Sequence, residues 1–101
     1  MDWRVHSQAV EEFMDLPDSD RKVVEDNIEA RKNRDNPILN QRNVGISYDN
    51  HGEPIHYFKV EEDGLSYRVF FQISGQEVVL LGVRERDEDT YFNLRKYTKR
   101  V

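Results

Sequence analysis

The chain has 101 residues, of which 35% are charged and 37% hydrophobic, and its formal net charge is −5. This length suits a single compact core, so we expect one domain over residues 1–101. The negative charge argues against a protein that coats nucleic acid with its whole surface. The absence of cysteine excludes disulfides, thiolate catalysis and cysteine-ligated zinc.

The distribution of charge and hydropathy narrows the possible partners. No apolar run approaches the roughly 20 residues needed to cross a bilayer, and no signal peptide is recognisable, so we expect a cytoplasmic protein without membrane association. Residues 1–35 contain ten acidic and six basic side chains, whereas residues 54–101 contain eight of each. The C-terminal half is therefore the better candidate for binding an anion.

The first third of the chain predicts a short strand and two helices. Alternating apolar residues favour a strand over 3–6, and Ser7 is the expected N-cap of the helix that follows. A Leu16-Pro17 corner ends that helix. The second helix is expected to begin at Asp18 or the residue after it and to run to about Asn33, so the two helices form an antiparallel pair.

The remainder predicts three or four antiparallel strands and a C-terminal helix. Strands are expected over 55–60, 67–73 and 79–86, with an acidic turn over 61–64 and a helix over 90–99. The region 43–51 is consistent with either an extra strand or a loop. Helices followed by a meander indicate an α+β fold with the helices on one face of the sheet.

Strand alternation predicts that positive charge gathers on the opposite face of this sheet. Arg68, Arg84 and Arg86 share one parity, whereas the other parity is apolar and is expected to face the helices: Tyr67, Val69, Phe71, Ile73, Val79, Leu81 and Val83. On the preceding strand the same face would carry Tyr57 and Lys59. The predicted surface is thus cationic and partly aromatic, with Tyr91 close in sequence: Tyr57, Lys59, Arg68, Arg84, Arg86 and Tyr91.

Such a surface has the groups that phosphate recognition uses, because arginine offers a planar fork of donors and tyrosine can stack on a base. The alternative is an ordinary solvated sheet face whose arginines pair with the acidic residues at 85 and 87–89. Glu61 and Glu62 are interpreted as turn surface rather than as an acid–base pair. The three histidines are scattered and no glycine-rich phosphate loop is present, so we expect neither a metal nor a cofactor.

Two segments near the C-terminus resemble a known family. Residues 67–73, and residues 79–83 followed by Arg84-Glu85-Arg86, resemble the late strands of the RelE/ParE superfamily, the toxins of type II toxin–antitoxin modules. The N-terminal order of strand, helix, Leu16-Pro17 and second helix is also similar. The resemblance implies a RelE-like arrangement with a short N-terminal strand, an antiparallel helical pair, a three- to four-stranded antiparallel meander and a C-terminal helix.

The RelE branch of this family implies metal-free cleavage of mRNA in the ribosomal decoding site, by attack of the ribose 2′-hydroxyl on the adjacent phosphate. By position, Arg68 and Arg84 match the arginines that stabilise the phosphate and assist the leaving group. Lys59 matches a lysine that would help to polarise the hydroxyl, and Tyr91 matches a tyrosine that stacks on the scissile nucleotide.

Two further positions are RNA-binding candidates. Arg86 is a second cation that could hold an RNA phosphate, and Tyr57 stands where the active RNases usually have another lysine. The implied partners are the ribosome, its mRNA and an antitoxin protein that covers the arginine face or displaces residues 90–100, with operator DNA bound only together with the antitoxin. Tyr57 and the negative net charge also suit a ParE-like toxin or inactive relative that acts by binding protein, and a nontoxic regulatory subunit is a third interpretation.

Overall fold

The computed structural model describes residues 1–100. The elements, in chain order, are β1 (Asp2–Val5), α1 (Ser7–Met14), α2 (Asp18–Lys32), the 3₁₀ helix η1 (Ile38–Asn40), β2 (Val44–Tyr48), β3 (Pro54–Glu62), β4 (Leu65–Ser74), β5 (Glu77–Glu85) and α3 (Arg95–Thr98). The predicted α+β fold is confirmed, with an N-terminal strand, two helices, an antiparallel meander and a short C-terminal helix. Within the described residues, no helix is long and apolar enough to cross a bilayer.

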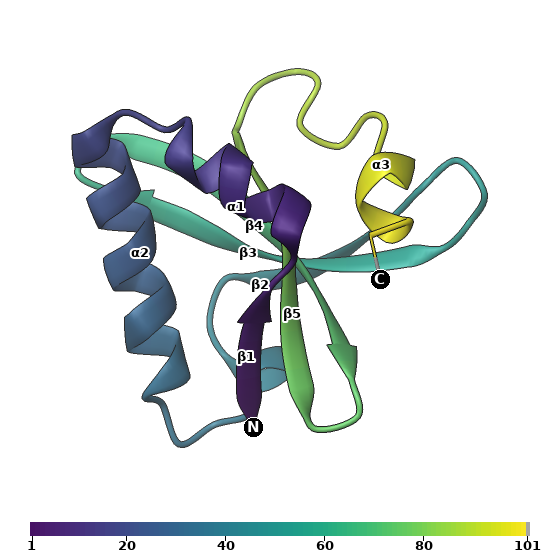
Figure 1. Ribbon diagram of the computed structural model, residues 1–101, viewed down its shortest axis with the longest axis horizontal. Helices are drawn as coiled ribbons and strands as arrows, with labels where there is room; N and C mark the ends of the chain where they lie inside the picture. The colour runs from purple at the N-terminus through teal and green to yellow at the C-terminus, as the bar shows by residue number, and fades with distance from the viewer. Residues whose placement is uncertain (101) are drawn as a thin grey trace.

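The strands form one mixed sheet in the order β1-β5-β4-β3-β2 (Figure 1). Strand β1 runs parallel to β5, whereas β2 to β5 pair as successive antiparallel neighbours. The region 43–51 thus contributes a fourth antiparallel strand. In Figure 1, α2 and α3 lie at opposite sides of the view with the strands between them.

The two N-terminal helices cover one face of the sheet. Helix α1 buries Ala9 and Phe13, and α2 buries Val24 and Ile28 against the same cluster. Helix α2 begins where the sequence predicts. The predicted N-cap is wrong by one residue, because the Nδ1 atom of His6 accepts the hydrogen bond from the backbone N–H of the second helical residue and leaves Ser7 inside the helix.

A β-bulge in the β4–β5 pair reverses the alternation of side chains along β5. Phe70 pairs with Gly82, but Phe71 pairs with Leu80, so Leu81 is an extra residue on β5. Even-numbered residues of β5 before the bulge therefore face α1 and α2, whereas even-numbered residues after it face α3. Gly82 faces α3, where a Cβ atom would overlap the ring of Tyr97.

Each face of the sheet carries an apolar cluster. The cluster beneath α1 and α2 includes Phe58, Val60, Tyr67, Val69, Phe71, Val78, Leu80 and Val83. The second, smaller cluster lies beneath α3 and contains Ile55, Phe70, Val79, Leu81, Leu94 and Tyr97, with Tyr57 packed against it. The prediction that Val79 and Leu81 share a face with Val83 is wrong because the bulge lies between them. The arginine-bearing face is thus partly apolar and covered.

The C-terminal helix is shorter than predicted, and two residues account for the difference. The Thr90 hydroxyl bonds to backbone groups of Asp87, and this contact favours a turn over a helix. Asn93 has a positive φ of 55°, which interrupts helical backbone. Only residues 95–98 of this segment are helical, yet Leu94 and Tyr97 are buried, so the segment contributes to the core.

The turn between β3 and β4 is also shorter than predicted. Asp63 and Gly64 form it alone, with φ values of 53° and 80°, as expected for a two-residue hairpin turn. Glu61 and Glu62 consequently belong to β3. The carboxylates assigned to the turn therefore project from the sheet, one of them beside the arginines.

Candidate phosphate-binding site

The sheet register places three cationic side chains in one row. Lys59 on β3 is directly opposite Arg68 on β4, and Arg68 is directly opposite Arg84 on β5. Directly opposed residues have Cβ atoms about 4.5–5.5 Å apart, and like charges so placed repel one another. The row therefore needs acceptors close by, and the chain supplies them.

Arg68 is at the centre of the row and is buried, with only 3% of its surface exposed. Its Nη1 atom donates to the Oε1 atom of Glu61 at 2.9 Å and to the carbonyl of Tyr67 at 3.0 Å. Its Nε atom donates to the hydroxyl of Tyr91 at 3.0 Å. Tyr91 and Glu61 therefore occupy the Nε and Nη1 donors of this guanidinium.

Glu61 is one of two residues of this site that the sequence prediction missed. It follows Tyr57 and Lys59 at alternate positions of β3, so the three side chains share a face, and this spacing was the signal that could have found it. A hydrogen bond from Ser66 and the neighbouring Arg68 hold the pKa of Glu61 below its ordinary value, although burial opposes them. The carboxylate is therefore ionised at neutral pH and neutralises Arg68.

Arg84 binds the C-terminal segment to the sheet. Its Nη1 atom donates to the carbonyls of Asp89 at 3.2 Å, Thr90 at 3.0 Å and Phe92 at 2.6 Å. Its Nε atom donates to the hydroxyl of Tyr97 at 2.9 Å, and its guanidinium carbon lies 4.9 Å from the centre of that ring. Tyr97 is a second contributor that the sequence analysis missed; its spacing of three from Leu94 was the available signal.

The other two predicted cations are less engaged. Lys59 is half-buried, and its ammonium has no hydrogen bond or ion pair within residues 1–100. Arg86 is exposed just beyond the end of β5, where its backbone N–H donates to the carbonyl of Ser66 at 2.9 Å. The structure therefore brings Lys59, Arg68 and Arg84 together and leaves Arg86 at the rim.

The two predicted tyrosines form the aromatic part of the site. The ring centres of Tyr57 and Tyr91 are 5.3 Å apart, and Tyr91 is 38% exposed. Burial, followed by the hydrogen bond with Tyr91, raises the pKa of Tyr57, so this phenol stays protonated at neutral pH. Tyr57 also lies against Gly45 of β2, where a Cβ atom would meet its hydroxyl. The exposed ring of Tyr91 is the one that a base can reach.

The site contains positively charged hydrogen-bond donors, two phenols and one ionised carboxylate. Donors of this kind stabilise charge that develops on a phosphate, and an adjacent amine can polarise a hydroxyl. No group of three or more His, Asp or Glu side chains among residues 1–100 is placed to hold a metal ion. Comparison of the chain with protein-family models, with curated proteins and with solved structures gives no match.

Proposed function

We propose that the protein is a RelE-like toxin of a toxin–antitoxin pair and that it cleaves mRNA on the ribosome. The single observation that carries this proposal is the row of Lys59, Arg68 and Arg84 beside an exposed tyrosine. Three adjacent cations suit the extra charge that a phosphodiester gains when a 2′-hydroxyl attacks it. The reaction would leave a cyclic phosphate and a free 5′-hydroxyl.

Each residue of the row would have a distinct part in this reaction. Lys59 would polarise the attacking hydroxyl, Arg68 would bind the phosphate oxygens, and Arg84 would assist the leaving oxygen. Tyr91 would stack on the scissile nucleotide once its hydroxyl leaves Arg68, and Glu61 would give up its place on Arg68 to the phosphate. Arg86 and Tyr57 would contact the RNA at the rim.

The proposed partners follow from the proposed activity. The protein would act in the cytoplasm on mRNA held by the ribosome, and an antitoxin would neutralise it by covering the arginine face or by displacing residues 90–100. Operator DNA would be bound only in complex with the antitoxin. No cofactor is required, because the row supplies the positive charge itself.

The test is primer extension on programmed ribosomes, with wild type, Lys59→Met and Arg84→Ala in parallel. Lys59→Met is the more informative variant, because the Lys59 ammonium makes no internal contact and the methionine keeps its aliphatic length. We expect wild type to cut within the decoding site and Lys59→Met to cut about 100-fold more slowly, the scale of one acid–base group. Arg84→Ala should also abolish cleavage, but it removes the anchor of residues 89–92 as well.

The matched control is Lys22→Met, which removes an exposed lysine from α2 and should leave cleavage unchanged. Far-ultraviolet circular dichroism and thermal melting check that each variant is folded. Intact mRNA after incubation with folded wild type would overturn the proposal, and full activity in Lys59→Met would remove that residue from the site.

A second candidate function is a toxin or inactive relative that acts by binding protein. The observation that favours it is the internal use of two of the three cations, since Glu61 neutralises Arg68 and three carbonyls surround Arg84. In that case the row would be structural and the exposed surface around it would be the docking site. Arrested growth with uncut ribosomal mRNA would support this second function over the first.

A further inference from the structure

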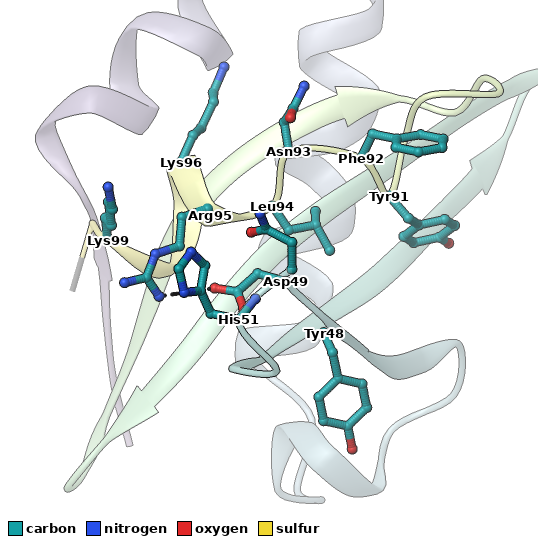
Figure 2. A pocket seen from close by; sticks show the side chains of 11 residues that line it. Tyr48, Asp49, His51, Tyr91, Phe92, Asn93, Leu94, Arg95, Lys96 and Lys99 are labelled. Atoms are coloured by element: carbon teal, nitrogen blue, oxygen red, sulfur yellow. Dashed lines mark hydrogen bonds and ion pairs between the residues drawn. The ribbon is translucent and has the colours of Figure 1, made fainter.

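A pocket of about 730 Å³ lies next to the cationic row, between the β2–β3 turn and the C-terminal segment (Figure 2). Its volume is within the range of about 300–1,000 Å³ that is usual for small-molecule sites. Its wall comes from two parts of the chain, residues 48–51 and residues 91–96 with Lys99. Tyr91 belongs both to this wall and to the candidate site, so the two are continuous.

One end of the pocket is aromatic and open. Tyr91 and Phe92 lie together at this end in Figure 2, whereas Tyr48 comes from the β2–β3 side and its ring points away from them. Phe92 and Tyr48 are 63% and 60% exposed, so their rings face solvent without a packing partner that would explain them. Exposed rings at a concave site are suited to stacking on nucleic acid bases, since every base presents a π-face.

The other end is cationic. Lys96 and Lys99 extend from this end in Figure 2, with Arg95 between them and the turn. The acidic groups near the cations are already engaged: Asp49 and Glu53 bind Arg95 at 3.2 and 2.9 Å, and Glu12 lies 3.5 Å from Lys96. Lys99 has no ion-pair partner within residues 1–100, so its charge is directed at solvent.

The floor of the pocket is formed by hydrogen bonds to one buried carboxylate. The buried carboxylate of Asp49 accepts hydrogen bonds from the Thr98 hydroxyl at 2.7 Å and from the backbone N–H groups of His51 and Glu53 at 2.8 and 2.9 Å. These bonds join the β2–β3 turn to α3 and so connect the two walls of the pocket.

We propose that this pocket binds a nucleotide of single-stranded RNA that adjoins the one at the cationic row. The base would stack on Phe92, and the phosphate would be held by Lys99. The proposal rests on the proposed function in so far as RNA is the ligand, and it extends that function by assigning a second nucleotide subsite. Contact with the neighbouring base is where a preference for sequence would arise.

The test measures binding without ribosomes. The probe is a fluorescein-labelled five-nucleotide RNA with 2′-O-methyl groups, which lacks the attacking hydroxyl and cannot be cleaved. Fluorescence anisotropy at several salt concentrations gives both the dissociation constant and its salt dependence. We expect wild type to bind, and we expect inorganic tripolyphosphate to compete poorly because it has no base to stack.

Two variants separate stacking from charge. Phe92→Ala should weaken binding about tenfold, within the range measured for removal of one stacking ring, with the salt dependence unchanged. Lys99→Met should weaken binding less at moderate salt and lower the slope of log K against log salt by about 0.7, the contribution of one phosphate contact on a single strand. The controls Leu39→Ala and Lys22→Met remove an exposed apolar and an exposed cationic side chain elsewhere and should change neither quantity.

The outcomes distinguish this proposal from the proposed function. RNA binding that is indifferent to both Phe92→Ala and Lys99→Met, or is fully displaced by tripolyphosphate, would overturn the pocket. If ribosomal mRNA is nevertheless cut, the proposed function stands without it. Binding with the expected signatures but without cleavage on ribosomes would support the pocket and refute the RNase.

Discussion

The two faces of the sheet both bury aromatic side chains, but they are covered in different ways. On one face, α1 and α2 bring their own apolar residues to a large cluster of buried hydrocarbon side chains. On the other face, a four-residue helix and a loop cover a small cluster and are attached largely by polar contacts. Arg84 binds three carbonyls of the loop, and Asp49 binds Arg95 and Thr98.

This difference shows how one small sheet combines a stable scaffold with a removable cover. Burial of apolar area is non-directional and is spread over many atoms, whereas each polar contact depends on one partner and competes with water. The loop and α3, which together form this C-terminal cover, should therefore detach from the sheet at a lower free-energy cost than α1 and α2. Because the cationic row lies under that cover, access to Arg68 and Arg84 would depend on the weaker face.

The largest effect on the free energy of unfolding should come from alanine substitutions at Phe70 and Phe71. These neighbours are fully buried on opposite faces of the sheet, so the two variants compare the two faces. Phe71→Ala should lower the free energy of unfolding by about 3–5 kcal/mol, as for other buried phenylalanines. Phe70→Ala should cost less, because the short C-terminal segment can move inward and fill part of the cavity. Urea denaturation measures both. An equal or larger loss in Phe70→Ala would contradict the idea of a loosely attached cover.

A sharper way to loosen one face alone is Gly82→Ala. The added methyl group would overlap the ring of Tyr97, so we expect a loss of about 1–3 kcal/mol, the usual cost of overpacking. The damage should be local. Hydrogen exchange of the amides at 94–98 should accelerate strongly, while the amides of α2 should keep most of their protection.

The control for Gly82→Ala is the double variant with Tyr97→Leu. A smaller side chain at 97 leaves room for the methyl group, so the two changes should cost less together than the sum of the single losses. Additive losses would mean that the Gly82–Tyr97 contact does not explain the effect. In that case another feature must hold the C-terminal cover in place.

Much of the stable face could be predicted from sequence, because the information there is local. The start of α2 was predicted at Asp18 or the next residue, and the faces of β3 and β4 followed from alternation. The bulge opposite Phe71 could not be predicted, since it depends on how two strands pair rather than on either strand alone. One extra residue was sufficient to transfer Val79 and Leu81 to the other face.

The sequence predicted which cations share the candidate site, but not how deeply they are buried or which groups they bind. Lys59, Arg68 and Arg84 do share a face, as strand parity indicates. The prediction of an exposed cationic surface is wrong for Arg68, because burial depends on Glu61 and Tyr91, which are distant from it in sequence. Arg31 shows the same limit: it lies near the end of the predicted second helix, yet it is buried with its guanidinium carbon 4.4 Å from the ring centre of Phe58.

Asp49→Asn tests whether the polar attachment of the cover depends on charge. Although burial opposes it, hydrogen bonds from Thr98, from the backbone N–H groups of Glu53 and His51 and from Arg95 hold the pKa of Asp49 well below its ordinary value of 3.8. A lowered pKa means that the stabilisation is complete above about pH 5 and decreases as the pH falls through the unfolded-state value and below. The melting temperature of the variant should therefore be lower than that of wild type at pH 7, and the difference should narrow below about pH 4.

The control for the Asp49 experiment is Asp26→Asn, which removes an exposed carboxylate that pairs with Lys22 on α2. Its melting temperature should differ little from that of wild type at any pH in the range, because exposed ion pairs contribute little. A difference between wild type and Asp49→Asn that stays constant down to pH 2 would mean that shape rather than charge is responsible. The attachment of the β2–β3 turn to α3 would then not depend on the ionised carboxylate.

The smallest effect on stability, and the most direct on the site, should come from Glu61→Gln. Glu61 is 44% exposed and glutamine keeps an oxygen that can accept from the buried Arg68, so the free energy of unfolding should fall by about 1 kcal/mol. The substitution leaves Arg68 without its carboxylate partner, and it makes the net charge beside the row more positive by one. We expect the uncleavable RNA to bind several-fold more tightly at low salt, with the gain reduced as salt screens the added charge.

The neighbouring residue provides the control for this last comparison. Glu62 accepts a hydrogen bond from Asn27 of α2 at 2.8 Å, so Glu62→Gln removes the same charge from β3 on the side of the stable face. Its effect on RNA binding should be the smaller one, because its charge is farther from Arg68. Equal tightening in both variants would mean that RNA responds to net charge alone. Tightening in Glu61→Gln only would indicate that Glu61 and a phosphate compete for the same guanidinium.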